Sequence, residues 1–207
     1  IAVQHVAGRP IMSGFHAQFS IGGLAGAMIL TLLLRAGLGV VGSAAPVAAM
    51  LLLLALSHQS SLLDDRHTST DVSFAIVPTP RVLLLGMLCF IAFLAEGAVL
   101  DWSAVFLREH VGMDRSLAGV GYAVFSVAMV AGRLTGDGLS HRFGDRRLLR
   151  AGGAVAALGF LILAAVPSRA AALGGLLLVG VGASNIVPLL FSASGRVRGV
   201  PPSLALA

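Results

Sequence analysis

Long apolar runs, separated by short polar stretches, are the dominant pattern along the chain. Each run is close to the length of about 20 mostly apolar residues that an α-helix needs to cross a bilayer. The runs do not alternate between apolar and polar residues, as the strands of a membrane barrel do. The pattern therefore predicts an all-α polytopic membrane protein with six transmembrane helices. These are Met12–Leu34, Gly39–Leu56, Val82–Leu107, Leu117–Leu134, Leu148–Val166 and Ala170–Phe191.

One polar stretch is much longer than the others. Residues Ser57–Arg81 are rich in Ser, Asp, His and Thr and contain Pro78 and Pro80. Such a composition is typical of a flexible linker between two helical units. We therefore expect two helices, a linker and then four helices.

The arginines give the expected orientation, because cytoplasmic loops of membrane proteins carry an excess of positive charge. Alternate loops differ clearly in their arginine content, and the richer set includes the 57–81 and 135–147 loops. We expect this richer set to be cytoplasmic. Its arginines are Arg9, Arg66, Arg81, Arg142, Arg146, Arg147, Arg150, Arg196 and Arg198.

Composition excludes several classes of protein. Hydrophobic residues make up 57% and charged residues 11% of the chain, whereas a soluble domain carries roughly 25% charged residues. The basic residues are all arginines in short loop clusters, so we expect no nucleic-acid partner despite a pI near 11.2. The single cysteine, Cys89, and the scattered histidines lack the spacing of a metal site, so we expect neither metal nor cofactor.

A glycine- and arginine-rich segment follows the fourth predicted helix. It reads Gly132-Arg-Leu-Thr-Gly-Asp-Gly-Leu-Ser-His-Arg-Phe-Gly-Asp-Arg-Arg147. This segment resembles the signature loop of the major facilitator superfamily (MFS), with His141 standing where that family usually has an acid. The resemblance implies a cytoplasmic gate. Its residues would be Gly132, Arg133, Gly136, Asp137, Arg142, Gly144, Arg146 and Arg147.

Two further stretches carry the same resemblance. Residues 8–27 look like the fifth helix, and residues 95–104 like the seventh helix, of fucose-permease-like MFS transporters. The resemblance implies helices five to ten of twelve: residues 1–56 end the N-terminal bundle, 57–81 form the central linker and 82–207 begin the C-terminal bundle. Since the chain also begins without Met, we expect a piece of a longer secondary transporter of the bacterial inner membrane. The implied partners are a small solute such as a sugar, and a proton or another ion.

Glu96 is the main candidate for coupling or substrate binding. It lies past the middle of an apolar run, where an ionised side chain costs at least about 2.5–3.5 kcal/mol. Cys89, Ala92 and Ser103 share its helix face, which we expect to line a cavity. We expect no arginine at matching depth, so a cationic partner would come from the substrate or from outside this chain. The alternative is a structural Glu bonded to a neighbouring helix.

Four other side chains are weaker candidates for the same site. Asp101 lies about 140° around the helix from Glu96, and is either a substrate residue or a solvated gate residue. Trp102 is either a substrate platform or an interfacial anchor. His16 is either a relay or a packing residue, and Asn185, just before Pro188, either marks a broken helix at the cavity or bonds a neighbouring helix.

Two other functions remain open at this point. An intramembrane hydrolase would need a nucleophile and a base at one depth, and neither Ser103 nor Ser126 has a histidine nearby in the predicted spans. A non-transporting scaffold or receptor is compatible with the helices, but does not require an intramembrane acid. We therefore expect a transporter and not an enzyme.

Overall fold

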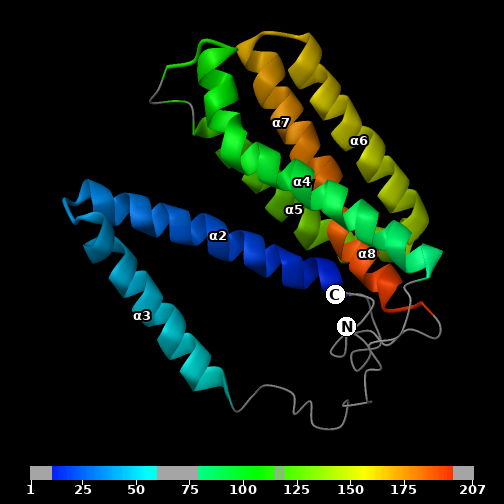
Figure 1. The fold of residues 1–207 in the computed structure, drawn as a ribbon, viewed down its shortest axis with the longest axis horizontal. Helices are drawn as coiled ribbons and strands as arrows, with labels where there is room; N and C mark the ends of the chain where they lie inside the picture. The colour runs from blue at the N-terminus through cyan, green and yellow to red at the C-terminus, as the bar shows by residue number, and fades with distance from the viewer. Residues whose placement is uncertain (1–10, 60–78, 115–116, 118, 198–207) are drawn as a thin grey trace. The chain divides into compact units, whose positions relative to one another are not determined.

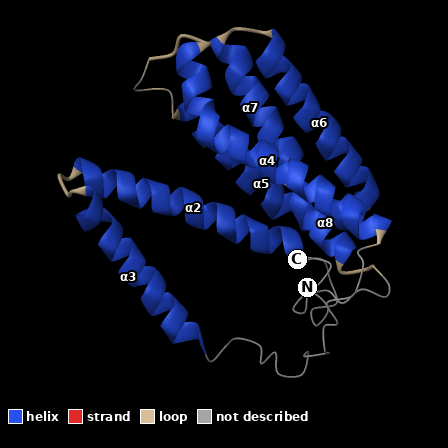
Figure 2. Ribbon diagram, in the orientation of Figure 1, coloured by secondary structure: helices blue, strands red, loops and turns tan. Residues whose placement is uncertain are grey.

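The computed structural model describes residues 11–59, 79–114, 117 and 119–197, and the described part of the chain is helical without strands (Figures 1 and 2). This confirms the predicted all-α class. The helices are α2 (Met12–Arg35), α3 (Val40–His58), α4 (Pro80–Glu109), α5 (Val120–Phe143), α6 (Asp145–Ala165), α7 (Arg169–Ala183) and α8 (Ile186–Ser194).

Five stretches are long and apolar enough to cross a membrane. They are α2, α3, α4, α6 and the stretch Arg169–Ser194 that contains α7 and α8. The remaining predicted span is also a helix, α5. Its second half carries the charged residues Arg133, Asp137 and Arg142, which lower the mean hydropathy of the helix. The six predicted helices therefore exist, while composition alone supports five of them as spans.

Helix ends follow local signals. Thr79 caps α4 by accepting a hydrogen bond from the backbone N–H of Val82 at 3.4 Å, and Pro80 occupies the first turn, where its missing N–H costs nothing. The helix thus begins two residues before the predicted Val82. Most of the predicted linker lies outside the described residues, and its flexibility stays a prediction.

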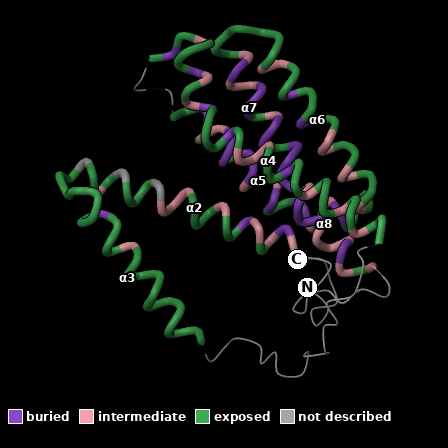
Figure 3. Tube along the Cα trace, in the orientation of Figure 1, coloured by how far each residue is buried: buried purple, intermediate pink, exposed green. Residues whose placement is uncertain are grey.

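The chain forms two compact units, residues 1–21 with 78–207, and residues 22–77. The second unit contains the rest of α2 and all of α3. Its apolar side chains are largely exposed, as the colours of Figure 3 show. Exposed leucines and valines on such helices suit a surface that faces lipid or other helices.

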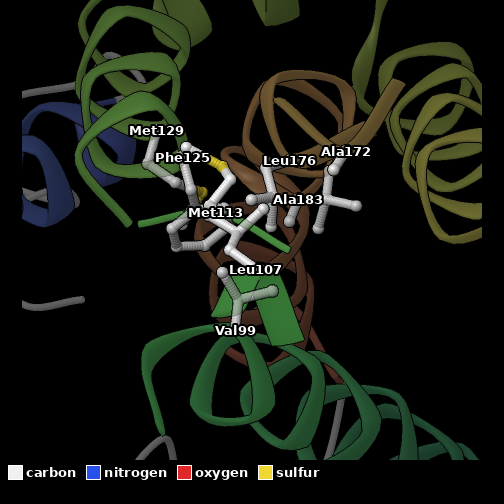
Figure 4. Packing of buried hydrophobic residues seen from close by; sticks show 9 residues of the cluster. Val99, Leu107, Met113, Phe125, Met129, Ala172, Leu176 and Ala183 are labelled. Carbon is white, nitrogen blue, oxygen red and sulfur yellow. The ribbon is translucent and has the colours of Figure 1, made fainter. Parts of the chain in front are cut away.

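The core of the first unit lies where α4, α5 and α7 meet (Figure 4). Leu107 of α4, Phe125 of α5 and Leu176 of α7 are nearly or completely buried there. Gly180 lets α7 approach α5 so closely that a Cβ atom would lie 2.6 Å from the carbonyl oxygen of Phe125. Small residues at such contacts are typical of helix packing in membranes, where close backbone approach replaces the hydrophobic effect.

The last span is interrupted at Ser184 and Asn185, which separate α7 from α8. Asn185 and Pro188 predict a break at this position, and the structure has it there. An interruption of this kind frees backbone carbonyl groups that a continuous helix would use. The carbonyl group of Ser184 is one that finds a side-chain partner.

Candidate functional site

Glu96 and Arg133 form an ion pair inside the first unit. One terminal guanidinium nitrogen of Arg133 lies 3.1 Å from Oε1 and 3.2 Å from Oε2 of Glu96. The side chain of Arg133 is only 4% exposed, and that of Glu96 is 20% exposed. Each residue lies near the middle of its helix, α4 for Glu96 and α5 for Arg133.

Arg133 also bonds two other elements. Its Nε donates to the backbone oxygen of Ser184 at 3.2 Å, at the end of α7, and its Nη1 donates to the hydroxyl of Ser20 on α2. A planar guanidinium can hold several acceptors in fixed directions at once. The side chain thus connects α5 with α2, with α4 and with the interruption between α7 and α8.

This arrangement corrects one sequence prediction and locates a second predicted residue. An arginine does lie at the depth of Glu96, so the partner of the carboxylate comes from this chain. The resemblance assigns Arg133 to the gate loop. Its side chain lies in the helical bundle and not in the loop, and reaches Glu96 and the end of α7 there, so its gate role stays a prediction. It lies there because side chains on a helix lean toward its N-terminus, here away from the loop.

Asp137 lies one turn after Arg133 and binds the start of α2. Its two carboxylate oxygens accept the backbone N–H groups of Ser13 at 3.2 Å and of Gly14 at 3.0 Å. These N–H groups belong to the first turn of α2, where no intrahelical acceptor exists. The negative charge also faces the positive end of the helix dipole. Asp137 therefore caps α2 from a neighbouring helix.

Two glycines of the signature segment allow α5 to approach the interrupted span. A Cβ atom on Gly132 would lie 2.2 Å from Oγ of Ser184, and one on Gly136 would lie 1.7 Å from Oδ1 of Asn185. The space that a methyl group would fill is used by a hydrogen bond from Nδ2 of Asn185 to the carbonyl oxygen of Gly132, at 2.9 Å. Asn185 thus bonds a neighbouring helix, and its predicted cavity role stays a prediction.

The remaining loop residues lie at the junction of α5 and α6. Gly144 has a φ of 82°, a conformation that L-residues rarely adopt, and this agrees with the tight turn expected there. The next residue, Asp145, accepts hydrogen bonds from the hydroxyl of Ser140 and from Arg196, the latter at 2.5 Å. Arg142 covers the ring of Phe143 at 5.3 Å. The two other predicted loop residues, Arg146 and Arg147, lie on the first turn of α6.

His16 lies near the start of α2 and packs against α8. Its ring lies 5.6 Å from that of Phe191, which in turn lies 6.3 Å from the ring of Phe93 on α4. Its Nδ1 lies 3.0 Å from the carbonyl oxygen of Met12. This short aromatic series fixes the first half of α2 against α4 and α8, which favours the packing role for His16.

The structure separates the rest of the predicted site from Glu96. Asp101 and Trp102 are exposed, Trp102 at 65%. Ser103 is buried in the wall of an apolar pocket of about 290 Å³ between α4, α6 and α7, and its hydroxyl finds no partner among the described residues. The face that Ala92, Glu96 and Ser103 share therefore turns toward the helical bundle and not toward one common cavity.

Sequence reasoning missed Ser20 and the carbonyl group of Ser184. Neither carries a distinctive signal, because serines are frequent and a carbonyl group becomes an acceptor only where a helix is interrupted. Arg133 did carry a signal, since it is an ionisable residue inside an apolar run, and the same rule that selects Glu96 selects it.

Interrupted and glycine-packed apolar helices around a buried ion pair are typical of a multi-pass membrane protein. The chain belongs to the Major Facilitator Superfamily, whose sequence model matches residues 11–199. This family is one of transporters and not of enzymes.

Three curated bacterial proteins are similar to the chain. An uncharacterised MFS-type transporter of Yersinia pestis is 42% identical over 207 residues, covering 100% of this chain and 54% of the relative. An uncharacterised transporter of Sinorhizobium fredii is 35% identical over 211 residues, covering 97% of this chain and 54% of the relative. The membrane protein MosC of Rhizobium meliloti is 30% identical over 203 residues, covering 95% of this chain and 48% of the relative. The chain thus spans about half the length of these relatives. No solved structure matches it.

Proposed function

We propose that the chain is the central part of a secondary active transporter that moves a small solute by alternating access, coupled to a proton or another ion. The observation that carries this proposal is the buried pair of Glu96 and Arg133. The family and the relatives named as transporters agree with it.

The ion pair supports a role in transport because burying its two charges costs free energy. Desolvating two charges costs several kcal/mol for each ion, and a well-packed apolar pair would often be as stable. Ionisable residues inside membrane spans therefore commonly mark ion or substrate pathways. Glu96 is the coupling carboxylate: it takes up a proton in one state and ionises against Arg133 in the other.

The segment Gly132–Arg147 forms the gate of this transporter on the cytoplasmic side. Support comes from Asp137, whose contact with Ser13 and Gly14 joins α2 to α5. In the proposed arrangement α2 and α3 end the N-terminal bundle, and α4 begins the C-terminal bundle. The contact therefore joins the two bundles and closes the cytoplasmic end.

The finer assignment follows the resemblance of the two stretches at residues 8–27 and 95–104. The chain supplies helices five to ten of a fucose-permease-like transporter in the bacterial inner membrane, and its solute is small and polar, such as a sugar. Asp101 and Trp102 lie toward the extracellular side, and the linker 57–81 lies in the cytoplasm.

Solute-driven proton movement tests the proposal. The full-length protein that contains this chain is reconstituted into liposomes loaded with a pH-sensitive dye, and a panel of sugars and other small polar solutes is added outside. We expect at least one solute to change the internal pH, and protein-free liposomes to show no change. A transporter that accumulates none of the panel and moves no ion under any imposed gradient would contradict the proposal.

A further inference from the structure

We propose that Arg133 exchanges between two carboxylates, Glu96 and Asp137, and thereby transmits the protonation of Glu96 to the contact between α5 and the start of α2. The inference rests on the proposed function, since it assigns Arg133 as the positioning residue that links coupling to gating. Glu96 is the partner in the structure, and Asp137 is the partner that takes over when Glu96 is neutral.

The spacing on α5 places Arg133 within reach of both acids. Arg133 and Asp137 are four residues apart, and side chains at this separation are neighbours on a helix surface. Both contact α2, Arg133 through the hydroxyl of Ser20 and Asp137 through the backbone of Ser13 and Gly14. An arginine side chain is long and flexible enough to turn from one acid to the other without movement of the helix.

Charge decides which acid is the partner. With Glu96 ionised, the three groups carry one positive and two negative charges, and Arg133 is neutralised by Glu96. When a proton from water binds one carboxylate oxygen of Glu96, the known partners left to Arg133 are all neutral: the oxygens of Ser20 and Ser184 and the other oxygen of Glu96. A buried cation with neutral partners alone is costly. Asp137 offers the nearest carboxylate on the same helix, and charge-assisted hydrogen bonds are the strong ones.

Few other groups influence this choice. His16 on α2 lies between Ser13 and Ser20 in the sequence, and its ring contacts the carbonyl oxygen of Met12 and the ring of Phe191. From Ala170 to Ser194, which includes most of α7 and all of α8, the sequence contains no titratable side chain. On α4 itself, Cys89 and Asp101 lie about two turns before and more than one turn after Glu96.

When Arg133 pairs with Asp137, the start of α2 loses its cap. A carboxylate that pairs with Arg133 is a weaker acceptor for the N–H groups of Ser13 and Gly14, because its charge is already compensated. The first turn of α2 then loses the cap that faces its dipole. The contact between α2 and α5 weakens, and the cytoplasmic end opens. When Glu96 ionises again, Arg133 returns to it and Asp137 restores the cap.

A thiol at position 13 reports this opening without any knowledge of the solute. Ser13 is only 2% exposed and Ser13→Cys is nearly isosteric. Cys89→Ser removes the single thiol of this chain, and any cysteine elsewhere in the full-length protein is replaced by Ser as well. The full-length protein in inside-out vesicles is treated with a membrane-impermeant maleimide across a pH series. Because the maleimide reacts with the thiolate, each rate is divided by that of free cysteine at the same pH. We expect this ratio to rise several-fold at acidic pH, and Glu96→Gln to keep it high at every pH.

The deciding variant removes the cation as well. Glu96→Gln combined with Arg133→Gln leaves Asp137 free to cap α2, so labelling should return to the slow rate. Glu109→Gln removes an exposed acid from the same helix and should leave labelling unchanged. Ala17→Cys, at another fully buried position of α2, is the second reporter if Ser13→Cys does not fold.

Two results would overturn the exchange: unchanged labelling in Glu96→Gln, or a double variant that labels as fast as Glu96→Gln. These results are separate from those of the transport assay. Transport with pH-independent labelling removes the exchange alone, and pH-dependent labelling without any transported solute removes the proposed function alone.

Discussion

At the scale of single residues, the pair of Glu96 and Arg133 has a measurable energetic signature. Removing one partner of a buried ion pair typically costs about 3–5 kcal/mol, because the other charge remains buried and unpaired. Removing both leaves two neutral amides that can bond each other. The two residues are therefore expected to be strongly coupled in a double-mutant cycle.

We expect Glu96→Gln and Arg133→Gln each to lower the midpoint of thermal unfolding in detergent, and the double variant to unfold at a higher temperature than Arg133→Gln. The coupling free energy of such contacting pairs is about 0.5–3 kcal/mol. Asp101→Asn, a change of an exposed acid, should leave the midpoint nearly unchanged. Additive losses in the double variant would show that the two side chains do not interact.

The two residues of the ion pair also differ in how well the sequence predicts them. Glu96 is predictable, because an acid in an apolar run is costly and therefore conspicuous. The same rule marks Arg133 as unusual, but the pairing of the two residues is not predictable, because Arg133 stands next to the predicted end of its span and is typical there of a loop residue. The helix continues to Phe143, nine residues beyond the predicted end at Leu134, which places Arg133 near the middle.

At the scale of helices, the contact of α5 with the interrupted span depends on Gly136. A methyl group there would lie 1.7 Å from Oδ1 and 2.6 Å from Cγ of Asn185, and 2.9 Å from Oγ of Ser13. Gly138, two residues on, has open space at the corresponding position. The two glycines form a matched pair that differs in packing and not in helix propensity.

We therefore expect Gly136→Ala to lower the thermal midpoint and the yield of monodisperse protein, because Asn185 must move and its bond to Gly132 is lost. Gly138→Ala should be tolerated or slightly stabilising, since Ala favours the helix over Gly by up to about 1 kcal/mol. Equal behaviour of the two variants in a thermal unfolding assay would contradict the close approach of α5 and the interruption.

Helix positions are largely predictable, and helix neighbours are not. Apolar runs locate six helices, and Pro80 and Gly144 mark ends that follow from their backbone preferences. The predicted end of α5 at Leu134 is too early, because the polar second half of the helix has the composition of a loop. That Asp137 caps α2 depends on two segments more than a hundred residues apart, and no local pattern contains this information.

At the scale of the whole molecule, the MFS resemblance and the family membership agree, while the branch and the position among twelve helices stay predictions. The chain spans about half the length of its relatives. Within the chain, the buried acid, its arginine and the capping aspartate lie close to the first half of α2. This arrangement connects a group that can titrate with a contact that can open.

The most direct test of the central claim is gradient-driven accumulation by Glu96→Gln in proteoliposomes, with a solute identified by the panel above. Gln keeps the size and the hydrogen bonding of Glu96 but cannot release a proton. Accumulation driven by a proton gradient should fail, while exchange of labelled for unlabelled solute persists. Glu109→Gln, a change of an exposed acid at the end of α4, should retain both activities. Accumulation by Glu96→Gln at the wild-type level, at normal expression and across pH, would contradict the assignment of Glu96 as the coupling carboxylate.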